Sequence, residues 1–249
     1  MAKSDKISSE TLDKIADTKY SSVLYEVARN SNTKLGTLEK LMEKKNTLLY
    51  IYIAANPLAT EEMLSRIFDE CIDEIPDIAY SLAKNPNTPE YVLAKIVSND
   101  DYCEDYEICE DIAIHKNTSI STLKILAKHE VSDVRIAVAE SEKVTSDILI
   151  KLVKDDEWDV RRAVAISQNV TADILSKLAS DKEFSIRSIV AKHEKTSDKT
   201  LRKLSKDKAA CVRLEVANNP NTPDDVLKNL SNDKYESVKL MAVRNLANR

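Results

Sequence analysis

The sequence DVRIAVA at residues 133–139 returns as DVRRAVA at residues 159–165, 26 residues later. The last alanine of this stretch is the small anchor of a repeat that continues in both directions, with some intervals stretched to 29 and 30 residues. The regular anchors are Ala113, Ala139, Ala165, Ala191 and Ala217, and the looser ones are Ala28, Ala54, Ala83 and Val243. A period of 20 to 50 residues is typical of repeat architectures, in which each unit buries its apolar face against its neighbours. The sequence therefore predicts a repeat protein.

Apolar columns around the anchor indicate two helices in every unit. Val160 and Val164 stand five and one residues before their anchor, and the same two columns are apolar in the other units. Because they are four residues apart, they share one face of a helix, helix A. Leu175 and Leu178 stand ten and thirteen residues after that anchor, and this i, i+3 pair marks a second helix, helix B. We expect an all-α protein of about nine two-helix repeats.

The turn between the two helices has its own pattern. Asn-Pro-Asn-Thr-Pro occurs at residues 85–89 and again at residues 219–223. An asparagine before proline is disfavoured in a helix, so helix A should end there, and Thr88 should cap helix B. The first asparagine belongs to a column two residues after the anchor, which holds histidine at His115 and His193. We expect both histidines to close helix A rather than to act in catalysis.

These motifs resemble the leucine-rich repeat variant family. Residues 158–165, WDVRRAVA, are similar to its helix A signature, and residues 219–227 are similar to its linker and helix B. The likeness spans about residues 20–249 and implies a right-handed α-solenoid, an α–α superhelix related to HEAT-like repeats. Family units have about 24 residues and a tight second helix, so a 26-residue unit favours a fuller α-helix B. The cysteine-rich iron–sulphur module of some members is missing, and the resemblance implies no activity.

Composition suggests one domain with two surface chemistries. The unbroken repeat predicts a single domain over residues 1–249, with an N-terminal cap at 1–20. Residues 21–130 form an acidic, tyrosine-rich part with two insertions, and residues 131–249 form a regular part. Net charge is −8 over residues 1–130 and +3 over residues 131–249, together −5. Such asymmetry predicts different partners for the two parts.

Other features of the sequence limit the location and the chemistry of the protein. It has no apolar leader and no apolar run of membrane-spanning length, and its four cysteines are scattered. These features favour a cytoplasmic protein with free thiols. With one glycine, no glycine-rich phosphate loop is expected, and no metal-binding spacing or catalytic triad is evident. We expect neither a cofactor nor enzymatic activity.

The first candidate surface is a column of basic residues four positions before the anchor. Its members are Arg135, Arg161, Arg187, Arg213 and Lys239. One positive charge per repeat would suit a phosphate backbone or an acidic peptide. The alternative is a structural ladder, in which each arginine pairs with an aspartate of an adjacent unit, such as Asp133 or Asp159. Both interpretations are open at this point.

The second candidate surface lies around the two enlarged units. The acidic residues there are Asp69, Glu70, Asp73, Glu74 and Asp77, then Asp100, Asp101, Glu104, Asp105 and Glu107; the tyrosines on neighbouring A helices are Tyr25, Tyr50, Tyr52 and Tyr80. Tyrosine beside acid would suit a basic protein segment. The alternatives are a solvated loop with packed tyrosine rings and, at residues 100–105, a loose divalent-cation site without the spacing of a calcium-binding loop.

Trp158 is a further candidate, since some HEAT-like DNA glycosylases use tryptophan and aspartate in a basic groove. Trp158 and Asp159 also fit the ordinary repeat signature, which favours a structural role.

Taken together, the sequence predicts a non-enzymatic scaffold that binds a protein or peptide partner, as a monomer or weak homodimer without membrane contact. The alternative function is a nucleic-acid-binding solenoid that uses the arginine column.

Overall fold

The computed structural model describes residues 7–71, 77–99, 102 and 105–249. Within these residues the chain forms 18 α-helices and no strand. The chain divides into two compact units, Met1–Lys143 and Val144–Arg249. The single continuous domain stays a prediction. No helix among the described residues combines the length and apolarity needed to cross a bilayer.

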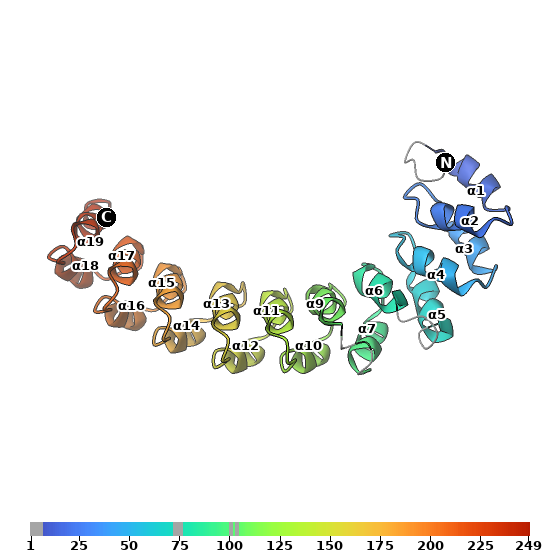
Figure 1. Cartoon of the computed structure of the whole chain (residues 1–249). Helices are drawn as coiled ribbons and strands as arrows, with labels where there is room; N and C mark the ends of the chain where they lie inside the picture. The colour runs from blue at the N-terminus through green and yellow to red at the C-terminus, as the bar shows by residue number, and fades with distance from the viewer. Residues whose placement is uncertain (1–6, 72–76, 100–101, 103–104) are drawn as a thin grey trace. The chain divides into compact units, whose positions relative to one another are not determined.

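The first unit alternates the two predicted helix types (Figure 1). Its A helices are α2 (Ser21–Ala28), α4 (Thr47–Ala54), α6 (Asp77–Lys84), α9 (Tyr106–Ile114) and α11 (Ser132–Glu140). Its B helices are α1 (Ser9–Ile15), α3 (Leu35–Met42), α5 (Glu61–Cys71), α7 (Glu90–Val97) and α10 (Ile120–Leu126). Each A helix packs on the next A helix, from α2 to α11. This stacking of helix pairs is an α-solenoid.

The second unit repeats the same arrangement. Its B helices are α12 (Ser146–Leu152), α14 (Ala172–Leu178), α16 (Asp198–Leu204) and α18 (Asp224–Leu230). Its A helices are α13 (Trp158–Ile166), α15 (Phe184–Lys192), α17 (Ala210–Asn218) and α19 (Glu236–Ala247), and they pack in sequence from α13 to α19. The B helices are α-helical, as the 26-residue unit predicted.

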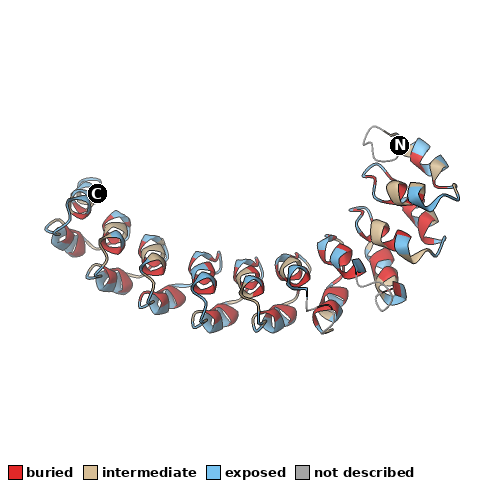
Figure 2. Ribbon diagram, in the orientation of Figure 1, coloured by how far each residue is buried: buried red, intermediate tan, exposed pale blue. Residues whose placement is uncertain are grey.

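The core lies between the A and B rows of each unit, where the buried sides of the helices face one another (Figure 2). All five regular anchors have no solvent exposure. The apolar columns of both helices are buried with them, for example Val160 and Val164 of α13 and Leu175 and Leu178 of α14. The helix faces predicted from the sequence are therefore confirmed.

The asparagine column joins consecutive repeats. The side-chain amide of Asn219 donates to the carbonyls of Ala191 and His193, at 2.8 and 3.1 Å, at the end of the preceding A helix. Its own oxygen accepts from the backbone N–H of Asn221 at 2.9 Å. Asn56 and Asn85 make the same contacts in the first unit. Because the last carbonyls of a helix lack intrahelical partners, this column satisfies them from the next repeat. The predicted helix-end role is confirmed.

The predicted role of Thr88 is wrong. Helix α7 begins at Glu90, with Pro89 as its N-cap and no side-chain capping bond. The Thr88 hydroxyl instead donates to the Leu82 carbonyl at 2.6 Å, back toward helix A, and Thr222 does the same to Val216. The threonine is buried one position before the cap, so it ties the turn to the helix that precedes it.

Candidate functional site

The arginine column lies inside the second unit rather than on its surface. Arg187 is 6 % exposed, and its Nε and Nη2 donate to the carboxylate of Asp207 at 2.6 and 2.9 Å. Its Nη1 donates to the carbonyls of Asp181 and Lys182. Arg161 and Arg213 are buried in the same way against Asp181 and Asp233. Each of these guanidinium groups thus links the turn before its own A helix to the turn before the next A helix.

This geometry corrects the expected aspartate partners. Each buried arginine pairs with an aspartate in the turn before the next A helix, twenty positions after it, and not with an adjacent unit's aspartate from the column of Asp133 and Asp159; Asp159 is exposed. The Arg187 hydrogen bond lowers the pKa of Asp207, against the raising effect of burial, so the pair stays ionised. Four of the five guanidinium N–H groups are used, which leaves little capacity for a phosphate.

The two ends of the column differ from its middle. Arg135 is half-buried, and its Nη1 donates to the carbonyls of His129 and Glu130 at 2.7 and 2.8 Å. Lys239 is also half-buried and pairs with the exposed Glu236 at 3.1 Å. The fully buried, doubly bonded form of the ladder is therefore seen at the three arginines of the second unit.

The four tyrosine candidates have different positions. Tyr25 and Tyr52 stack on one another, with ring centroids 4.8 Å apart, and Tyr80 is 40 % exposed. Tyr50 is only 1 % exposed, so its expected place on a binding surface is wrong. Its hydroxyl donates to Glu70 at 3.0 Å; burial, then this bond, raises the pKa of Tyr50 to about 12. The Tyr50 ring is therefore part of the core, and its hydroxyl links α4 to α5.

Part of the predicted acidic surface lies outside the described residues. This applies to Asp73, Glu74, Asp100, Asp101 and Glu104, and with them most of the proposed cation site at residues 100–105. Among the described residues, no group of histidine, cysteine, aspartate or glutamate side chains is arranged to hold a metal ion.

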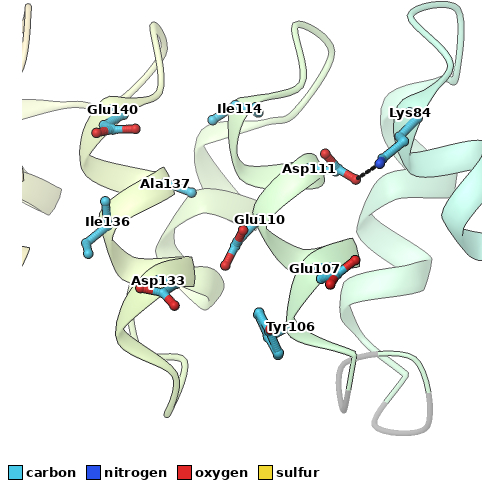
Figure 3. Close-up of a pocket in the computed structure, with 10 residues that line it drawn as sticks. All are labelled: Lys84, Tyr106, Glu107, Glu110, Asp111, Ile114, Asp133, Ile136, Ala137 and Glu140. Carbon is cyan, nitrogen blue, oxygen red and sulfur yellow. Dashed lines mark ion pairs between the residues drawn. The ribbon is translucent and has the colours of Figure 1, made fainter.

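An acidic hollow of about 570 Å³ lies on the A helices of the first unit, over α6, α9 and α11 (Figure 3). We call it the acidic groove. It is lined by Lys84, Tyr106, Glu107, Glu110, Asp111, Ile114, Asp133, Ile136, Ala137 and Glu140. Five carboxylates thus face one lysine, with an aromatic ring and aliphatic side chains among them.

The charges of this groove are mostly not neutralised. Lys84 pairs with Asp111 at 3.5 Å, at one side of the groove (Figure 3). Within the described part of the chain, the carboxylates of Glu107, Glu110, Asp133 and Glu140 have no ion pair. Burial, and then the negative charges of Asp133, Asp111 and Glu107, raise the pKa of Glu110. A cation placed among these groups would relieve their mutual repulsion.

Sequence reasoning identified Glu107 as part of an acidic surface but missed the rest of the groove, although the repeat register carries a signal for it. Positions six and three before the anchor, and one after it, lie on one exposed side of helix A. In α9 these positions are Glu107, Glu110 and Ile114, and in α11 they are Asp133, Ile136 and Glu140. The corresponding residues of α15 are serine, serine and lysine. These positions are therefore acidic in only a few repeats, and the net charge of the chain does not reveal this local concentration.

Trp158 begins α13 and is 44 % exposed. Asp159 and Arg162 of the same helix are also exposed, and α13 holds no second aromatic residue. A base-excision role for these residues stays a hypothesis without a neighbouring aromatic side chain on this helix to support it.

The histidines are integrated into the repeat turns. His115 Nε2 lies 2.8 Å from the Asn85 carbonyl, and its Nδ1 accepts the backbone N–H of Asn117 at 3.0 Å. The ring therefore carries its proton on Nε2 and is neutral. Burial lowers the pKa of His115, and nearby Lys116 and Lys143 lower it further. Burial also lowers the pKa of His193.

We expect the stability of the protein to fall on mild acidification. Since the folded-state pKa of His115 lies below the unfolded value near 6.5, its full stabilisation is present above pH 6.5. It is lost as the pH falls toward the lower folded-state pKa. The variant His115→Asn places the usual residue of the column there and should reduce this loss. Urea midpoints at about pH 7.5 and pH 5.5 measure the effect.

Adding His193→Asn should flatten the dependence further. The aspartates of the arginine ladder titrate at lower pH, because their pKa values are depressed below 3.8, and so they do not obscure this window. An unchanged pH dependence in the double variant would contradict the assignment of both histidines as neutral in the folded protein.

Comparisons with known proteins point to the fold alone. No protein family and no curated protein matches the sequence. A solved structure of a leucine-rich repeat variant with a novel repetitive structural motif is similar, with a TM-score of 0.59 and 18 % identity over 84 % of this chain and 85 % of that one. An engineered protein aligns over 96 % of this chain and 88 % of its own, with a TM-score of 0.38 and 15 % identity, which is too low to support a shared fold. The chain has the fold of a leucine-rich repeat variant.

Proposed function

We propose that this leucine-rich-repeat-variant fold serves as a non-enzymatic scaffold that binds a basic segment of a partner protein in the acidic groove. The observation that carries the proposal is a set of carboxylates on α9 and α11, Glu110 among them, that have no ion-pair partner among the residues that the structure describes. Repeat solenoids commonly use such extended surfaces for binding. In this proposal the protein acts in the cytoplasm, as a monomer or weak homodimer.

The lining of the groove indicates the chemistry of the ligand. Lysine or arginine side chains would pair with Glu107, Glu110 and Asp133, and the negative field would speed their association. Ile114 is 58 % exposed and Tyr106 is 43 % exposed, so apolar residues between the basic ones would also find contacts. A basic, partly apolar peptide fits this mixture better than a polycation alone.

The test measures binding of a fluorescein-labelled peptide of alternating lysine and leucine residues by anisotropy. We expect the double variant Glu110→Gln with Asp133→Asn to weaken binding about tenfold or more, since each lost charge pair contributes to both affinity and association rate. The variant should fold normally, because removing like charges from a crowded site relieves repulsion.

The matched control is Glu61→Gln with Glu90→Gln, which removes two exposed carboxylates from B helices of the same unit. Its affinity should stay near that of the wild type. Equal weakening in both variants would mean that net charge alone attracts the peptide and would overturn the groove as the site.

A further inference from the structure

Lysines gather on the turns that lead from helix B to helix A in the second unit. Lys182 and Lys208 lie in two of these turns, and Lys177 and Lys203 lie in the last turn of the preceding B helices. All are exposed. We call this set the lysine edge; its members are Lys177, Lys182, Lys203, Lys206, Lys208, Lys228 and Lys234.

The buried arginines neutralise the aspartates of these turns and so leave the lysine edge positive. Each turn also carries an aspartate, and these three, Asp181, Asp207 and Asp233, are buried and bonded to arginines. The buried pairs are neutral overall, so the aspartates do not cancel the lysine charges. Across the described residues, none of the seven lysines forms an ion pair. Lys203 bonds to the Ser180 hydroxyl instead.

The positive charge grows along the unit. At the position of Asp156 in the first of these turns, the next three turns have a lysine: Lys182, Lys208 and Lys234. A hollow of about 430 Å³ at the start of the edge is lined by lysines and also by Asp155 and Asp156. Each later turn keeps one aspartate and has a lysine in place of the second. The strongest cationic surface is therefore on the turns before α17 and α19.

Aromatic side chains stand beside these lysines. Phe184 is the first residue of α15 and is 54 % exposed, and Tyr235 directly precedes α19 and is 48 % exposed. Lys234 Nζ lies 5.3 Å from the Tyr235 ring centroid. Exposed aromatic rings at the start of A helices, close to these lysines, offer planar surfaces as well as charge.

We infer that the lysine edge binds single-stranded nucleic acid. Proteins that bind single strands combine a positive track for the phosphates with aromatic side chains on which bases stack. Neighbouring A helices pack about 8–10 Å apart, so the edge presents its cations at regular short intervals. A double helix would use the lysines but would leave Phe184 and Tyr235 without unstacked bases. An acidic peptide would likewise leave the rings without bases to stack on.

The test uses anisotropy of labelled oligothymidine and of a duplex of equal length, each about 20 nucleotides, at about 50 to 200 mM salt. Binding to the single strand should weaken log-linearly with salt. The variant Lys182→Glu with Lys208→Glu should weaken it about tenfold or more and reduce the salt slope. The matched control, Lys192→Glu with Lys199→Glu, changes the same charge near the opposite turns and should bind like the wild type.

A second variant tests the base contacts. Phe184→Ala with Tyr235→Ala should weaken single-strand binding about tenfold or more and duplex binding little. No binding of any oligonucleotide at low salt would overturn the inference, and so would equal loss in both lysine variants. Binding of an oligoglutamate peptide without the oligonucleotides would assign the edge to acidic proteins instead. These results are independent of the acidic groove, which lies in the other unit.

Discussion

Replacing Arg187 with alanine is expected to lower the free energy of unfolding by about 3–5 kcal/mol, the typical cost of removing one partner from a buried ion pair. Asp207 would be left ionised and 9 % exposed without its bidentate partner, and the carbonyls of Asp181 and Lys182 would lose their donor. Urea denaturation followed by circular dichroism measures the loss.

The control is Arg202→Ala, which removes an arginine that pairs with Asp198 and Asp225 on the exposed surface. Exposed pairs contribute about 1 kcal/mol or less, so this variant should stay close to the wild type. If both variants lost the same small amount, the ladder would not stabilise the repeats. The buried arginines would then need another explanation.

Replacing Asn219 with alanine is expected to be nearly as damaging. The carbonyls of Ala191 and His193 and the N–H of Asn221 would each lose a partner in a buried or half-buried turn. A buried polar group left unsatisfied costs about 1–3 kcal/mol. Because the lost bonds join two repeats, the variant should also unfold less cooperatively, which thermal and urea transitions would show as a broadened curve.

Asn219→His provides the rescue. His115 occupies this column in the first unit, with one ring nitrogen on a carbonyl of the preceding repeat and the other on its own turn. Asn219→His should therefore recover most of the stability at neutral pH and lose it in acid. An alanine variant as stable as the histidine variant would show that the column does not link the repeats.

The sequence predicted those features that depend on one helix at a time. The 26-residue interval, the buried anchors such as Ala165 and the leucine pairs of helix B all follow from helical periodicity, which places residues three and four apart on one face. The end of helix A at the asparagine column was predicted for the same local reason. The predicted cap at Thr88 was wrong by one residue. The Thr88 hydroxyl does not cap helix B; it bonds back to the Leu82 carbonyl of the preceding helix A.

The sequence could not decide which residues meet across repeats. Arg187 and Asp207 lie twenty residues apart, and their pairing depends on how far the intervening B helix carries the chain before it turns back. Tyr50 and Tyr52 show the same limit at shorter range, since one is buried and the other stacks on Tyr25 of the preceding A helix. Periodicity identifies a shared face, but not which face a neighbouring repeat will cover.

The acidic groove and the lysine edge were decided by tertiary structure for the same reason. Glu110 and Asp133 come from different A helices, and only their stacking sets them in one hollow. The charge of the lysine edge depends on the burial of aspartates that a residue count scores as negative. Local sequence determines the helices and their apolar faces, because those forces act within a few residues. The offset between repeats determines the sites, because it sets which charges are paired and which remain free.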